Sequence, residues 1–121
     1  MKRTLLFIIF IYVFMLISCQ ESEITEEKAV KIAKSFVEKN LMGQKEEIIY
    51  FDSPIVEELE FEDSYIVYYA DRKNQELQEI DLKGKTVWRV IYTTNLDARL
   101  GPNTIFIDKY SGKIYGFLMR Y

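Results

Sequence analysis

The pattern of apolar and polar positions divides the chain into one helix followed by strands. Within residues 25–42, apolar side chains recur at intervals of three and four, while lysine and glutamate fill the other positions. This spacing predicts an amphipathic helix. Thr25 is the expected N-cap, with Glu26 and Glu27 in the first turn, and Gly43 is expected just beyond the C-terminal end. The single apolar face of this helix needs a sheet to cover it.

The rest of the chain has strand patterns. They cover residues 46–52, 55–62, 65–70, 86–94, 104–108 and 113–121, and a weak strand pattern ends the polar connection 71–85. No second helix separates these segments, so crossover connections are not expected and the sheet should be antiparallel. We therefore predict an α+β fold in which one N-terminal amphipathic helix packs on a curved antiparallel sheet of four to five strands.

Alternation assigns the strand residues to faces. Leu59 and Phe61 point one way, and Glu58, Glu60 and Glu62 point the other. Trp88, Val90 and Tyr92 share one face of the strand 86–94. The larger aromatic residues are expected mainly in the core beneath the helix: Trp88, Tyr92, Phe106, Tyr115 and Phe117. The alternative is a concave pocket on the sheet, lined by Trp88 and Tyr92.

The first 19 residues form a separate unit, "MKRTLLFIIFIYVFMLISC". Two basic residues precede an apolar run over 5–17, which is shorter than the ~20 residues of a membrane-spanning helix and is typical of a signal peptide. Cys19 is the single cysteine of the chain, and "LISC" resembles the lipobox of bacterial lipoproteins. The resemblance implies cleavage before Cys19 and acylation of that residue. An ordinary secretory signal or a single-pass anchor is the alternative.

The predicted lipobox implies how the chain divides into segments and where the protein is located. Residues 1–18 would be the signal peptide, 19–24 the acylated cysteine with a short tether, and 25–121 a single domain. Several acyl chains give stable membrane attachment where one chain would not. Gln20 stands where some lipoproteins carry the aspartate that retains them at an inner membrane. We therefore expect the protein to be lipid-anchored in the cell envelope, on the periplasmic side of an outer membrane or at the cell surface.

Charge is unevenly distributed along the chain. The net charge is −3, and removal of Lys2 and Arg3 with the leader makes it −5, which argues against nucleic acid as a partner. Residues 46–81 carry a balance of −10 and residues 82–121 a balance of +5. The two halves are expected to neutralise each other across strands. The alternative is an acidic surface that recruits a basic protein partner, with these candidate residues: Glu57, Glu58, Glu60, Glu62 and Asp63.

The residue inventory disfavours catalysis. The chain has no histidine, and its one cysteine lies in the lipobox, so the commonest general base and the thiol nucleophiles are missing. We predict a protein that is not an enzyme, with no cofactor and no metal. Two weaker alternatives remain, a hydrolase using carboxylates of the acidic strand and a calcium site in the loop containing Asn95, Asp97 and Asn103.

Two segments carry a resemblance to known families. "TEEKAVKIAKSFV" and "VWRVIYTTNLDARLGPNTIFIDKYSGKIYGF" are similar to PepSY-like domains and to immunity proteins of polymorphic toxin systems with a cystatin-like fold of the nuclear-transport-factor type. The resemblance implies a membrane-anchored lipoprotein that binds a protein, in toxin immunity or in peptidase inhibition or regulation. It supplies no catalytic residue. The alternative function is a small-molecule or ion carrier that uses the Trp88 and Tyr92 pocket.

Overall fold

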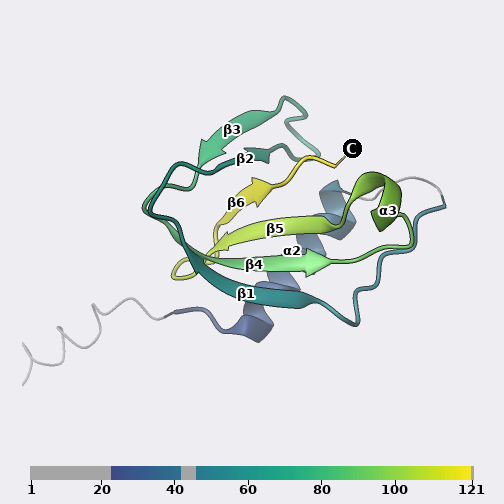
Figure 1. Cartoon of the computed structure of the whole chain (residues 1–121), viewed down its shortest axis with the longest axis horizontal. Helices are drawn as coiled ribbons and strands as arrows, with labels where there is room; N and C mark the ends of the chain where they lie inside the picture. The colour runs from purple at the N-terminus through teal and green to yellow at the C-terminus, as the bar shows by residue number, and fades with distance from the viewer. Residues whose placement is uncertain (1–22, 42–45, 121) are drawn as a thin grey trace, which may run out of the picture.

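The computed structural model describes residues 23–41 and 46–120 (Figure 1). In this part of the chain an α-helix, α2 (Glu26–Asn40), and a short helix, α3 (Asp97–Leu100), accompany a six-stranded sheet. The strands are β1 (Ile55–Glu60), β2 (Ile66–Tyr69), β3 (Gln78–Asp81), β4 (Thr86–Tyr92), β5 (Asn103–Asp108) and β6 (Ile114–Phe117). They lie in the order β1-β4-β5-β6-β2-β3, and the pairs are antiparallel.

The predicted α+β class and the antiparallel sheet are confirmed, but the strand count of four to five is wrong. The weak pattern before Leu82 forms a true strand, β3, because it pairs with β2 in a hairpin. The predicted strand 46–52 contributes an isolated bridge between Ile49 and Thr94 instead. The loop 95–103 contains the single turn of α3 and the first residue of β5.

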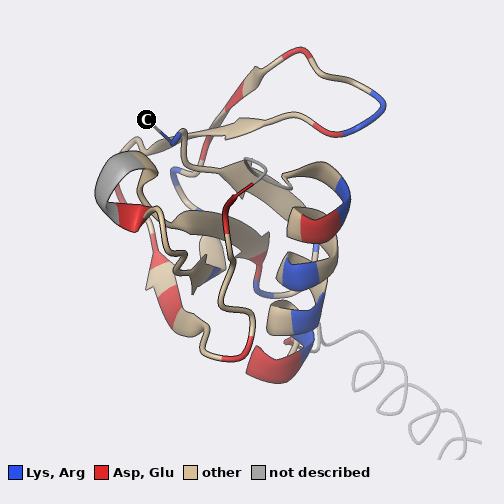
Figure 2. Cartoon of the chain, turned by 90° about the vertical axis from the view of Figure 1, so that its right-hand side faces the viewer, with Lys and Arg blue, Asp and Glu red and all other residues tan. Residues whose placement is uncertain are grey.

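Helix α2 forms as its pattern predicts. The Thr25 side chain accepts a hydrogen bond from the Lys28 amide at 3.2 Å, and two glutamates occupy the first turn. The helix ends at Asn40, and the expected end at Met42 and Gly43 lies outside the described residues. Its buried face consists of Ala29, Ala33, Phe36 and Val37. This face packs on β4 and β5, while lysine and glutamate residues fill other positions along the helix (Figure 2).

The sheet is packed on both faces. Val90, Tyr92, Ile105 and Ile107 meet α2 on one face. Val87 and Phe106 meet Val67 of β2 and Leu82, which follows β3, on the other face. Figure 1 shows β2 and β3 beyond β6, at the far edge of the sheet from β1. The expectation that Phe106 and Tyr115 lie beneath the helix is therefore wrong, since both belong to the second cluster.

Candidate functional site

The first candidate site is the acidic strand, and two of its five acids are neutralised within the fold. Glu57 lies opposite Arg89 in the β1–β4 register and forms an ion pair with it. Glu58 pairs with Lys109, which also lies 3.3 Å from the Glu23 carboxylate. The hydrogen bond to Glu58 raises the pKa of Lys109. The expected neutralisation across strands is confirmed for Glu57 and Glu58.

The other three acids stay exposed at the end of β1. Glu60, Glu62 and Asp63, called here the acidic corner, form no ion pair within the described part of the chain. The strand itself lies at an edge of the sheet. At its other end, large apolar side chains are exposed at Ile55, the first residue of β1, and at Ile48 and Tyr50 in the segment before it. The acidic corner, the open edge and these apolar residues together form what we call the β1 surface.

Trp88 and Tyr92 lie in the core beneath α2. The Trp88 indole N–H donates to the Ile24 carbonyl at 3.2 Å, and the Tyr92 hydroxyl donates to the Val30 carbonyl at 2.9 Å. Tyr92 is fully buried, which raises its pKa to about 12. Both polar groups are thus used to hold the helix on the sheet. Within residues 23–41 and 46–120, four surface cavities are lined by residues other than these two, so the geometry favours the core assignment over a pocket at these positions.

A buried ion pair was not anticipated from the sequence. The side chain of Glu47 is 1% exposed and pairs with Arg120, 73 residues away. The Thr94 hydroxyl donates to the same carboxylate at 2.8 Å, and Arg120 Nε donates to the Gly101 carbonyl at 3.0 Å. The hydrogen bond from Arg120 holds the pKa of Glu47 below its usual value. Nothing in the local sequence separates Glu47 from the other acids around it, so only the tertiary fold identifies it.

Two of the three side chains considered for calcium, Asn95 and Asp97, use an oxygen atom in hydrogen bonds within the fold. Asn95 Oδ1 accepts from the Ile48 amide at 2.7 Å, and Asp97 Oδ1 accepts from the Thr94 amide at 2.8 Å. Among the described residues, no group of three or more His, Cys, Asp or Glu side chains could hold a metal ion. The Asn95 side chain therefore ties the 46–50 segment to the end of β4, and Asp97 caps the turn that follows β4.

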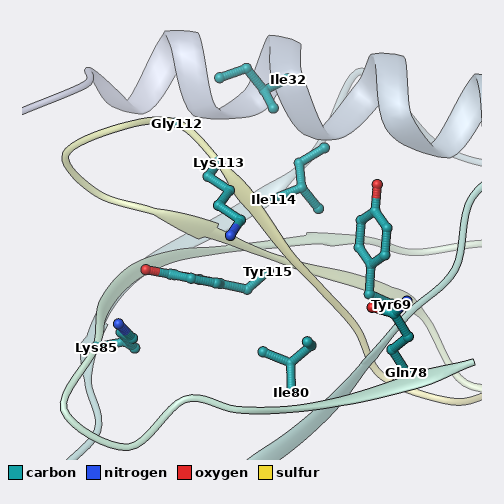
Figure 3. A pocket seen from close by; sticks show the side chains of 9 residues that line it. All are labelled: Ile32, Tyr69, Gln78, Ile80, Lys85, Gly112, Lys113, Ile114 and Tyr115. Atoms are coloured by element: carbon teal, nitrogen blue, oxygen red, sulfur yellow. The ribbon is translucent and has the colours of Figure 1, made fainter.

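A second candidate site is a cleft of about 660 Å³ between α2, the β2–β3 hairpin and β6 (Figure 3). Its lining residues are Ile32, Tyr69, Gln78, Ile80, Lys85, Gly112, Lys113, Ile114 and Tyr115. The β2–β6 pairing consists of Tyr68 opposite Phe117, so the start of β6 diverges from the hairpin and leaves this opening. Sequence periodicity could not anticipate the cleft, because it identifies the faces of strands and not where two neighbours separate.

The predicted lipidation site and signal peptide lie outside the described residues. In the described ranges, no helix has the length and apolar character needed to cross a membrane. We found no match to this chain among protein-family models, curated proteins or solved structures. Function is therefore inferred from the geometry of this chain.

Proposed function

We propose that this chain is a membrane-anchored, non-enzymatic lipoprotein that binds a protein partner through the β1 surface. The observation that carries the proposal is the acidic corner, three exposed carboxylates left without a partner in the described fold while their neighbours Glu57 and Glu58 are paired. Exposed like charges attract a surface of opposite sign and steer its approach. The expected partner thus presents lysine or arginine side chains.

The edge strand supports the same surface. Because β1 ends the sheet, one side of its backbone has no neighbouring strand. Such an edge accepts an extended segment from another chain by strand addition. Ile48, Tyr50 and Ile55 add exposed apolar area beside it, and tyrosine is enriched in protein interfaces.

The mechanism proposed is occlusion of the partner. A lipid-anchored module that covers a basic active surface would neutralise a toxin or restrain a peptidase at the envelope. Both roles need binding without chemistry by this chain. They agree with a sequence that has no histidine and whose single cysteine stands in the predicted lipobox.

The experiment is affinity capture from envelope extracts with the anchored protein. Replacing the acidic corner by lysine, as Glu60→Lys, Glu62→Lys and Asp63→Lys together, should weaken capture of the partner by about tenfold or more. A matched control reverses three exposed acids elsewhere, Glu38, Glu76 and Glu79. The control should retain the partner. Equal capture by both variants would exclude the acidic corner, and absence of any specific protein would contradict protein binding as the function.

A further inference from the structure

The cleft between α2 and the hairpin combines apolar walls with two cationic side chains. Ile32, Ile80 and Ile114 contribute aliphatic surface, and Tyr69 and Tyr115 contribute rings (Figure 3). The two lysines come from different turns, Lys85 before β4 and Lys113 before β6. The Lys85 ammonium lies 5.9 Å from the centre of the Tyr115 ring. In the close-up view, that ring lies between the two lysine side chains.

Neither lysine has a carboxylate partner within the described residues. On β3, Gln78 and Ile80 line the cleft, so the alternating residues Glu79 and Asp81 belong to the other face of the hairpin. Asp81 is also engaged by the Ser64 hydroxyl and by the Tyr65 amide. The cleft is therefore positive at Lys85 and Lys113, with these hairpin acids turned away.

One carboxylate near the cleft is occupied in a turn. Asp108 accepts hydrogen bonds from the Ser111 hydroxyl and from the Tyr110 amide. Burial, and secondarily the charge of Asp108, raises the pKa of the Tyr115 hydroxyl, so this phenol stays neutral at physiological pH. It can donate a hydrogen bond to an anion beside the two ammonium groups.

The fold holds the cleft open. At Gly116 the backbones of β6 and β2 come so close that an added Cβ would lie 2.9 Å from the carbonyl carbon of Tyr68. Away from this contact β6 diverges from β2, and Ile114 of β6 and Ile80 of β3 both line the opening. These apolar side chains are in contact with water in the open cleft. An apolar ligand that covers them removes this surface from water, which favours binding.

We propose that the cleft binds a small amphipathic anion, a single apolar chain or ring body that ends in a carboxylate. The apolar body would lie against the isoleucines and tyrosines, and the carboxylate would meet Lys85 and Lys113. A volume of about 660 Å³ is in the ordinary range of ligand pockets. The site is distinct from the β1 surface, so it does not depend on the proposed protein binding.

The test uses dodecanoate as the probe and residues 20–121 as the protein, since the buried apolar side chains of the described residues lie between Ile24 and Ile107. Cooperative thermal unfolding first verifies that each variant is folded. Isoleucine δ-methyl NMR signals then locate the ligand, and calorimetry measures affinity. We expect shifts concentrated at Ile32, Ile80 and Ile114. Lys85→Glu with Lys113→Glu should weaken binding by about tenfold or more, because two attractive charges become repulsive.

The matched control is Lys83→Glu with Lys28→Glu, which reverses two exposed lysines that do not line the cleft and should leave affinity unchanged. Dodecanol, of similar length but neutral, should bind at least about tenfold more weakly. Equal binding of dodecanol, equal binding by the cleft variant, or methyl shifts elsewhere would overturn the proposal. If the protein binds phosphatidylglycerol vesicles and this binding requires Lys85 and Lys113, the two lysines contact a bilayer surface instead. That result would also overturn the proposal.

Discussion

At the scale of single residues, buried charges connect segments that are distant in the sequence. Arg120 joins the end of the chain to Glu47, and Lys109 joins the turn after β5 to Glu58 in β1 and to Glu23 before α2. Lys109 also lies 5.9 Å from the centre of the Trp88 ring. The buried pair of Glu47 and Arg120 is costly to break, because removal of one partner leaves the other with an uncompensated charge.

The first prediction concerns Glu47→Gln. The substitution keeps the shape of the side chain but leaves Arg120 without its counter-charge, at a position where Glu47 is 1% exposed. We expect the free energy of unfolding to fall by about 2–4 kcal/mol, toward the lower end for a pair with one partly exposed member. Urea unfolding at pH 7 measures it. Glu46→Gln, in an exposed neighbour, is the control and should be nearly neutral.

The same pair predicts a dependence on pH. Arg120 lowers the pKa of Glu47 in the folded state from its ordinary value of 4.5. Because the pKa of Glu47 is lower in the folded state than in the unfolded state, the ionised carboxylate stabilises the fold above about pH 4.5. This stabilisation is lost as the pH falls through the pKa of the folded state. Between pH 6 and the acid range, wild type should therefore lose more stability than Glu47→Gln does. Parallel pH profiles for the two proteins would contradict this role.

The second prediction concerns Gly116. Its Cα faces the backbone of Tyr68, and an added methyl group would also meet Val67 Cγ2 at 3.1 Å. Because a backbone carbonyl cannot rotate away as a side chain can, Gly116→Ala should destabilise the fold by about 2–3 kcal/mol. Gly84→Ala is a useful comparison, since Gly84 has φ +77° with open space around it. There, left-handed backbone strain alone should cost about 1 kcal/mol. Equal thermal shifts for both variants would contradict the close approach.

At the scale of elements, the apolar pattern predicted helices and strands correctly where an element packs against a single neighbour in the core. Helix α2 and strand β4 follow their apolar spacing because each presents a defined face to the other. The segment 46–52 has a strand composition but forms no strand. Its amides at Ile48 and Tyr50 donate to the Asn95 side chain and to the Thr93 carbonyl, and Pro54 follows it. Strand β3 has a polar composition and forms because β2 provides its partner. Tertiary pairing decided both cases.

The third prediction tests the helix start. Thr25 caps α2 by accepting from the Lys28 amide, and Ile24 beside it donates its amide to the Lys109 carbonyl at 2.8 Å. Thr25→Ala should therefore reduce the free energy of unfolding by about 1 kcal/mol, through loss of one hydrogen bond at an unpaired amide. Thr25→Ser keeps the hydroxyl and should remain close to wild type. A loss in Thr25→Ser equal to that in Thr25→Ala would show that the methyl group, and not the cap, stabilises this end.

At the scale of the whole molecule, the sequence predicted the charge balance but not its geometry. The acidic and basic halves do meet, yet register alone determines that Glu57 faces Arg89 and that the acidic corner is left over. The cleft depends on the divergence of β6 from β2, which pair only at Tyr68 and Phe117 among the described residues. No spacing of apolar residues encodes that divergence, so Lys85 and Lys113 could not be connected before the fold was known.

The last prediction concerns attachment of the whole protein to the membrane. If Cys19 is acylated, cells grown with an alkyne-tagged palmitate should incorporate the tag into the wild-type chain, and Cys19→Ser should abolish incorporation, because serine offers no thiol to the lipid. Ser18→Ala changes the neighbouring residue without removing the sulfur and should stay labelled. Mass spectrometry should also find that the wild-type product begins at Cys19. A tagged Cys19→Ser chain, or an untagged wild type with an intact leader, would remove the anchor on which an envelope address and occlusion at a membrane depend.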